Sequence, residues 1–327
     1  MSTPLYSLSV GGVPVSSTGD ARLIELVLTD EVGFKSDSLS ITFDDSDQAI
    51  EWPRRGVEIK VQLGLGQLVD MGVYVVDAVQ SSGPPDVIRV SAKAASFVSG
   101  KAMQTRKCAS YEGVSLSDLC KMMAARYGMI ALVGSGAENV IFDHIDQRME
   151  SDLAFLNRAA QSAGYIVKPC MGKLLVDERF SGKSVSGKVL TPVVIDKSDV
   201  TNWTISEADK GSYGAVIAEY RDTKGGGVKE FVMGTGEPEL RLPHVYASKQ
   251  SAKRGAETKL RNLRKGQGSF VELTMPSDGT FFSGMPIVLT GFRRGVNGAY
   301  FVGRVTHHLR SGLTCNLTAL RKYEEVE

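Results

Sequence analysis

Histidines and clustered carboxylates are the side chains of this 327-residue sequence best suited to catalysis or metal binding. The four histidines are His144, His244, His307 and His308, and only the last two are close in sequence. Adjacent residues of a strand point to opposite faces, so His307 and His308 do not converge on one metal ion. We expect one buried, hydrogen-bonded histidine beside one solvated histidine.

Two carboxylate groups have simple structural explanations. Asp44, Asp45 and Asp47 lie in a loop without the ligand spacing and closing glutamate of an EF-hand, so we expect a turn with exposed carboxylates. Glu150 and Asp152 stand where a helix is expected to begin, and carboxylates there interact favourably with the helix dipole. We therefore favour a structural role over an acid–base pair.

Other signatures of chemistry are missing from the sequence. There is no G-x-S-x-G, Walker A or H-E-x-x-H motif, and Gly225–Gly227 lacks the strand–loop–helix context of a phosphate site. The cysteines Cys108, Cys120, Cys170 and Cys315 are widely spaced, which predicts reduced thiols. We expect no catalytic residue, no metal and no cofactor.

Composition excludes several classes of protein. The chain is 42% apolar and 23% charged with a net charge of +1, unlike a strongly basic nucleic-acid or membrane binder. The N-terminus MSTPLYSLSV has no features of a signal peptide, and no apolar run approaches the roughly 18 residues of a membrane span. We expect synthesis and assembly in a cytoplasm, without membrane contact.

The element pattern predicts a mainly β protein with an inserted α/β module. Residues 5–100 contain about six alternating strand candidates, which predicts a barrel or a sandwich. Helical spacing of apolar residues predicts helices near 115–127 and 151–163. From about 198 the chain is again β-rich, interrupted by a long helix near 248–263. We predict an N-terminal β-barrel over 1–104, a module over 105–190 and a C-terminal β-barrel over 191–327.

An internal repeat links the two β-rich parts. The segment 56–79 resembles 284–305, with glycine, tyrosine and two valines at matching offsets. Gly56 and Gly72 are 16 residues apart, and Gly284 and Gly298 are 14 apart. Chance similarity between two common turn–strand units is the alternative to two homologous barrels. If the barrels are homologous, a trimer presents six similar barrels in a ring and can contact a six-fold partner.

Several segments resemble one known family. Residues 147–160, QRMESDLAFLNRAA, look like the "ESDLAFLxRLA" segment of the phage late control D proteins. Weaker resemblances fall at 43–47, 282–292 and 303–309, so the similarity covers essentially the whole chain. The family is related to the hub part of type VI secretion spike proteins.

The resemblance implies a non-enzymatic baseplate hub of a contractile tail. Such a hub is a homotrimer between the hexameric ring of the tail tube and a trimeric spike, and it contacts other baseplate proteins. Nucleic acid would be met only in passage through the lumen. Since the sequence ends at Glu327 without a spike-like domain, the resemblance implies that the spike is a separate protein.

One charged feature has three interpretations. The long helix carries seven basic residues against the single acid Glu257. The basic residues are Lys249, Lys253, Arg254, Lys259, Arg261, Arg264 and Lys265. They form a solvated helix face, a docking surface for an acidic partner ring, or a contact with DNA in the tail lumen.

Two other classes of function remain as alternatives. A tail-associated peptidoglycan hydrolase would need a carboxylate pair or a metal site in a cleft, and the sequence offers no convincing one. A cell-wall-binding module would need aromatic side chains for sugar stacking, but residues 105–190 contain no tryptophan.

Overall fold

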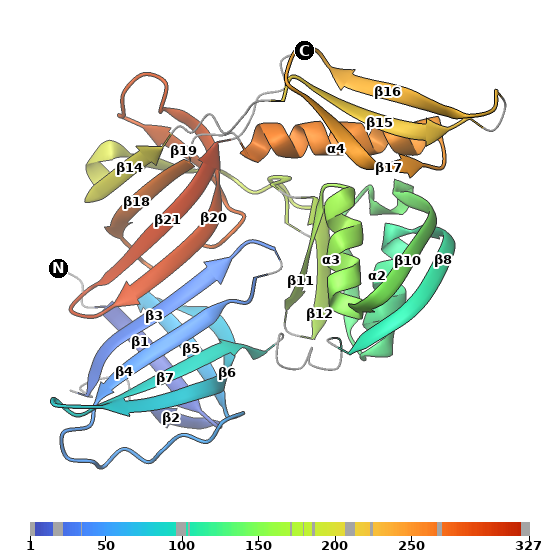
Figure 1. The fold of residues 1–327 in the computed structure, drawn as a ribbon. Helices are drawn as coiled ribbons and strands as arrows, with labels where there is room; N and C mark the ends of the chain where they lie inside the picture. Colours follow the sequence, from blue (N-terminus) through green and yellow to red (C-terminus); the bar gives the residue numbers. More distant parts are fainter. Residues whose placement is uncertain are drawn as a thin grey trace.

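Strands dominate the structure, which confirms the expectation of a mainly β protein (Figure 1). The computed structural model describes residues 4–15, 22–33, 35–95, 103, 105–170, 172–178, 180–184, 187–206, 213–222, 225–266 and 270–321. Cys170, Arg261, Asn262, Arg264, Lys265 and Gly266 are described by their backbone alone. Within these ranges, no helix combines the length and the apolar character needed to cross a membrane.

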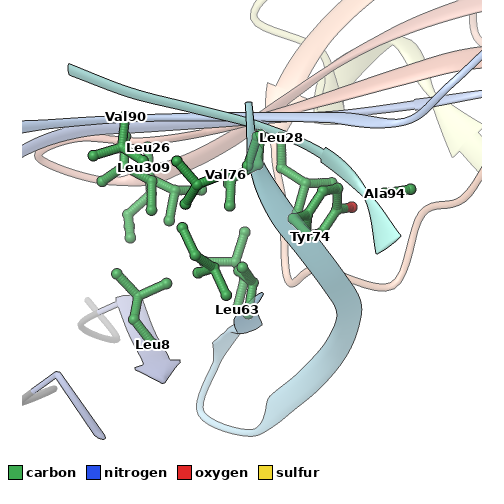
Figure 2. Close-up of a cluster of buried hydrophobic side chains, with 14 of the residues drawn as sticks. Leu8, Leu26, Leu28, Leu63, Tyr74, Val76, Val90, Ala94 and Leu309 are labelled. Carbon is green, nitrogen blue, oxygen red and sulfur yellow. The ribbon is translucent and has the colours of Figure 1, made fainter. Parts of the chain in front are cut away.

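The N-terminal part is a set of antiparallel strands around one apolar core (Figure 2). Its strands are β1 (Pro4–Val10), β2 (Val13–Val15), β3 (Leu23–Glu31), β4 (Ser38–Asp44), β5 (Glu58–Leu65), β6 (Leu68–Ser82) and β7 (Val87–Ala94). In β5, Ile59, Val61 and Leu63 are buried, because side chains two residues apart share one face of a strand. The alternation seen in the sequence therefore identified the inward-facing residues.

The middle segment, β8 to β12, has its own core. It contains β8 (Arg106–Ser115), α2 (Leu116–Arg126), β9 (Ile130–Val133), the short 3-10 helix η2 (Ala137–Asn139), β10 (Ile141–Ser151), α3 (Asp152–Ser162), β11 (Tyr165–Cys170) and β12 (Lys173–Glu178). Ser115 and Ser151 cap the two α-helices by accepting hydrogen bonds from backbone N–H groups of the first turn. The helices contact each other and share buried side chains, including Leu119 and Leu156. Both predicted helices are confirmed.

The C-terminal part contributes strands to two different sheets. Its elements are β13 (Val193–Asp196), η3 (Lys197–Asp199), β14 (Asn202–Ser206), β15 (Ala215–Arg221), β16 (Val228–Gly234), β17 (Glu239–Tyr246), α4 (Lys249–Gly266), β18 (Phe270–Pro276), β19 (Pro286–Thr290), β20 (Gly298–Leu309) and β21 (Leu313–Arg321). β15, β16 and β17 form a separate small sheet, inserted in the chain between β14 and β18. The boundaries predicted at 104/105 and 190/191 fall between β7 and β8 and between β12 and β13.

The strands of the N- and C-terminal parts join into one continuous large sheet. It has 13 strands, with most in the order β14-β18-β21-β20-β3-β4-β7-β6-β5-β1-β2. β20 is long enough to pair with β19 through its first residues and with β3 through Arg304–Leu309. Leu309 consequently packs beside Leu26 in the N-terminal core (Figure 2). The two-barrel arrangement predicted from the sequence is therefore not confirmed, although the C-terminal strands keep an apolar core of their own.

The repeat noted in the sequence recurs in the hydrogen bonding of the large sheet. Gly56 N donates to Val76 O, and Val76 N donates to Val57 O, each over 2.9 Å. Gly284 N likewise donates to Val302 O over 2.7 Å, and Val302 N donates to Met285 O over 2.9 Å. In both copies the strand is irregular directly after the valine, where the pairing with the next strand shifts register.

The two copies also share a strand order. β3-β4-β7-β6-β5-β1 in the N-terminal part corresponds to β14-β18-β21-β20-β19-β13 in the C-terminal part. A buried tyrosine, Tyr74 or Tyr300, occupies the same place in each copy and pairs with Ile59 or Ile287. One pairing differs, since β1 runs antiparallel to β5 whereas β13 runs parallel to β19.

Candidate functional site

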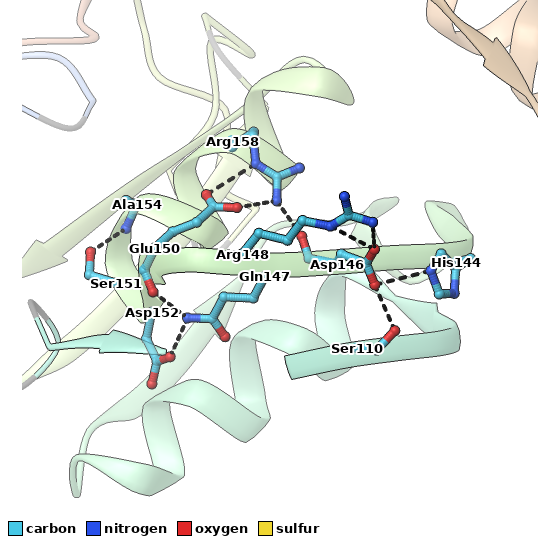
Figure 3. Close-up of polar contacts among 10 residues, drawn as sticks. All are labelled: Ser110, His144, Asp146, Gln147, Arg148, Glu150, Ser151, Asp152, Ala154 and Arg158. Carbon is cyan, nitrogen blue, oxygen red and sulfur yellow. Dashed lines mark hydrogen bonds and ion pairs between the residues drawn. The ribbon is translucent and has the colours of Figure 1, made fainter. Parts of the chain in front are cut away.

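The motif segment 147–160 spans the end of β10 and the start of α3, where it builds a dense polar network (Figure 3). Asp152, the first residue of α3, is at its centre, and its side chain is fully buried. The carboxylate accepts hydrogen bonds from Tyr127 Oη at 2.6 Å, Gln147 Nε2 at 2.8 Å and Lys107 Nζ at 2.9 Å. Arg126 lies 3.4 Å away. These partners come from β8, the end of α2 and β10, so one carboxylate ties three elements to α3.

The ionisation of Asp152 suits a structural role. Burial by itself raises the pKa of this carboxyl, but hydrogen bonds from Tyr127, Gln147 and Lys107 outweigh it and hold the pKa below its usual value. The same contacts raise the pKa of the Lys107 ammonium, chiefly through hydrogen bonds to Tyr127 and Asp152. A general acid at neutral pH needs the opposite, a carboxyl whose pKa is raised.

Glu150 is held separately from Asp152. Its carboxylate forms a two-pronged ion pair with Arg158, with distances of 3.1 Å from Nε and 2.6 Å from Nη2. Arg158 also donates to the backbone carbonyl of Asp146 over 2.6 Å (Figure 3). Because Glu150 and Asp152 engage different partners, they do not form the facing carboxylates of a hydrolase site. The sequence predicted only a favourable helix dipole here and missed the network, which depends on residues of β8 and α2.

The remaining candidates for chemistry are also engaged in local contacts. His307 is buried in β20, where its ring nitrogens lie 3.4 Å from Ser277 Oγ and 3.1 Å from Phe281 O. His308 lies 3.5 Å from Asn316 Nδ2, so the two neighbouring histidines occupy different surroundings as predicted. Across the described residues, no group of three histidine, cysteine, aspartate or glutamate side chains could hold a metal ion.

The loop after β4 is the predicted aspartate turn. Asp44 accepts hydrogen bonds from Ser46, and Asp47 pairs with Arg22 over 2.7 Å. Asp45 is buried and accepts from Ile50 N over 3.0 Å. Two of the three carboxylates therefore lie at the surface, and the third fixes the turn.

Helix α4 lies between the small sheet and the middle segment (Figure 1). Its buried residues Ala252, Ala256 and Leu260 pack on β15 to β17, a small sheet within the range 191–327 for which a C-terminal β-barrel was predicted. Helix α4 therefore covers the small sheet, which is separate from the large sheet.

The basic residues of α4 do not all face solvent. Lys249, Lys253 and Lys259 are exposed. Arg254 is half-buried and donates to the carbonyl of Ile141 in the middle segment over 3.5 Å. The side chains of Arg261, Arg264 and Lys265 lie outside the described part of the chain. Among the four basic side chains of α4 that the structure describes, three lysines are exposed and Arg254 contacts the middle segment.

Comparison with curated proteins finds relatives along the whole chain. The chain is 28% identical to the probable baseplate hub protein of Escherichia phage 186, over 99% of this chain and 94% of the relative. It is also 28% identical to the probable baseplate hub protein of Escherichia phage P2, over 99% and 95% of the two chains. The resemblance to baseplate hub proteins is confirmed. No protein-family model matches the sequence.

Solved structures agree in fold. The 43 kDa tail protein of prophage MuSo2 from Shewanella oneidensis superposes with a TM-score of 0.73 over 98% of both chains, at 12% identity. The c3393 protein of E. coli, a type VI secretion component, gives a TM-score of 0.57 over 97% of this chain and 77% of its own, at 12% identity. Together with the hub relatives, these likenesses support a structural role in a phage-type tail baseplate.

Proposed function

We propose that the chain is the structural hub of a contractile-tail baseplate, assembled as a homotrimer between the six-fold tail tube and a three-fold spike. The full-length similarity to two baseplate hub proteins carries this proposal. On this proposal, the protein works in the baseplate of a phage or phage-like particle and is synthesised and assembled in the host cytoplasm. The partners are the tube ring, the spike and other baseplate proteins.

The repeat within the large sheet supports the match between three-fold and six-fold symmetry. The two six-stranded sets, one N-terminal and one C-terminal, have the same strand order. The backbone hydrogen bonds at Gly56 also have equivalents at Gly284. Three chains would then supply six similar barrel-like units around one axis. Within each chain these units fall inside 1–104 and 191–327 and flank the module 105–190, while β15–β17 and α4 belong to neither unit.

The exposed lysines of α4 provide a candidate contact with an acidic ring. Lys249, Lys253 and Lys259 are exposed on α4, whose buried Ala252 and Ala256 hold the helix on the small sheet. Charges of this kind act mainly on the rate and specificity of association.

Mass in solution tests the proposal directly. The purified chain mixed with a candidate spike protein should give a complex with three copies of each. A stable dimer or hexamer of this chain, or a spike that never binds, would contradict it.

A zymogram on purified peptidoglycan addresses the enzymatic alternative. No observation favours a hydrolase, because Glu150 and Asp152 are both engaged in structural contacts. We expect no clearing by the chain, and a cleared band that persists after purification would overturn the non-enzymatic assignment.

A further inference from the structure

The end of β3 lies where the three parts of the chain meet. On one side, Val32 N donates to Gly303 O over 3.0 Å, and Glu31 pairs with Arg304 over 2.7 Å. These contacts fix β3 to β20 in the C-terminal part. On the other side β11 approaches closely, since a Cβ atom added to Gly33 would lie 3.7 Å from Ile166 Cγ2.

Lys168 of β11 reaches from the middle segment to this strand end. Its Nζ donates to Asp30 Oδ1, Asp37 Oδ1 and Glu31 O, each at 2.9 Å. An ammonium has three donors, so Lys168 is fully satisfied. The side chains are largely withdrawn from water, with exposed fractions of 18% for Lys168, 21% for Asp30 and 18% for Asp37.

Asp30 also binds the C-terminal part. Ser283, in the loop before β19, donates its backbone N–H to Asp30 Oδ2 and its hydroxyl to Asp30 Oδ1, both over 2.7 Å. Asp30 is therefore shared between Lys168, 138 positions away in sequence, and Ser283, 253 positions away. We call Asp30, Asp37, Lys168 and Ser283 the junction cluster.

The junction cluster carries one excess negative charge. Two carboxylates meet one ammonium in a site with little water, so the carboxylate with fewer favourable contacts is the easier to protonate. Burial raises the pKa of Asp37 to about 6, because the nearby Asp30 charge adds to burial and Lys168 offsets only part of it. Burial also acts on Asp30, but Lys168 and Ser283 outweigh it and hold its pKa below the usual value.

We propose that the junction cluster is a proton-linked lock, which holds the middle segment on the large sheet more tightly when Asp37 takes up a proton. With the middle segment detached, Asp37 would return to water and to an ordinary pKa near 3.8. The attached state therefore binds the proton more strongly, and attachment strengthens as pH falls from neutral through 6. This inference goes beyond the proposed function and does not rest on it.

Other charged groups around the cluster do not supply the same response. Glu31 is paired with Arg304 and lies 3.9 Å from Lys35. The pKa of Lys168 is raised, so it stays charged across this range. His307, in the neighbouring strand β20, has a pKa lowered mainly by burial and becomes charged only as the solution turns acidic. A proton taken up by His307 would therefore affect the contact between β3 and β20, not the contact of Lys168 with Asp37.

Hydrogen exchange of the full chain at pH 5 and pH 7 tests the lock, after correction for the intrinsic pH dependence of exchange. The pKa of Asp37 is about 6 in the attached state and near 3.8 in the detached state. Lowering the pH from 7 to 5 therefore shifts the equilibrium about tenfold toward attachment. Amides of 30–33 and 165–168 should therefore be about tenfold better protected at pH 5. The strand 270–276, within the C-terminal core, is the internal reference.

Two variants separate the lock from a purely structural contact. Asp37→Asn keeps an oxygen for Lys168 and Glu31 N but cannot titrate, so protection at the joint should no longer depend on pH. Lys168→Gln removes the compensating charge, so protection should fall at pH 7 and its pH dependence should become steeper than in the wild type. Equal protection at both pH values in the wild type, or an unchanged pH dependence in Asp37→Asn, would overturn the proposal.

Discussion

Asp152 provides the sharpest test of how the middle segment is held together. Its buried carboxylate accepts from Tyr127, Gln147 and Lys107 at 2.6–2.9 Å. In Asp152→Asn, the remaining oxygen can still accept from Gln147 Nε2. The new NH₂ group would face Lys107 Nζ, and two donors cannot bond to each other.

The cost follows from these lost contacts. A hydrogen bond to a charged group contributes about 1.5–3 kcal/mol, and the bonds from both Lys107 and Tyr127 are disturbed. Part of the lost stabilisation is recovered, because Lys107 and Arg126 are each 37% exposed and water can solvate them in the variant. We expect the free energy of unfolding to fall by about 3 kcal/mol.

Urea unfolding followed by circular dichroism measures this difference. Asp143→Asn, at an exposed position of the preceding strand β10, is the matched control and should change stability by less than about 0.5 kcal/mol. Since the folded pKa of Asp152 is lowered, its contribution is present at neutral pH and is lost as pH falls below about 4. The gap between wild type and Asp152→Asn should therefore narrow in acid. Equal stability of Asp152→Asn and Asp143→Asn at pH 7 would refute the network as a stabilising unit.

Further expectations follow from burial and charge. Leu156 is fully buried in the middle core, so Leu156→Asp should destabilise the chain by at least about 4 kcal/mol, and an unchanged melting profile would argue against this core. Changing Lys249, Lys253 and Lys259 together to glutamate should leave the chain folded but weaken attachment to the tube ring, most strongly at low salt. Particles assembled in normal yield from this triple variant would leave these lysines as a solvated helix face.

Local patterns predicted the elements of the fold well. The helices α2 and α3 were identified because the spacing of their apolar residues is a local pattern, contained within about a dozen residues. The equivalent glycines at 56 and 284 were also visible, since each marks a turn with a positive φ angle.

Contacts between residues far apart in the chain left no comparable pattern in the sequence. The pairing of β3 with β20 joins residues more than 270 positions apart, and it depends on the length of β20 rather than on any local pattern. The junction cluster is similar, because an aspartate at 30, another at 37 and a lysine at 168 are ordinary surface residues until the fold brings them together. The motif 147–160 pointed to the baseplate hub proteins that the chain resembles, but not to the role of Asp152, whose partners include residues of β8 and the end of α2.

A cryo-electron-microscopy reconstruction of the assembled tail tests the central claim most directly. It should place three copies of this chain between the tube and the spike, with the two six-stranded sets of each copy alternating around the axis as six similar units. Any other copy number, or a position away from the tube–spike junction, would contradict the proposal that this chain is the hub.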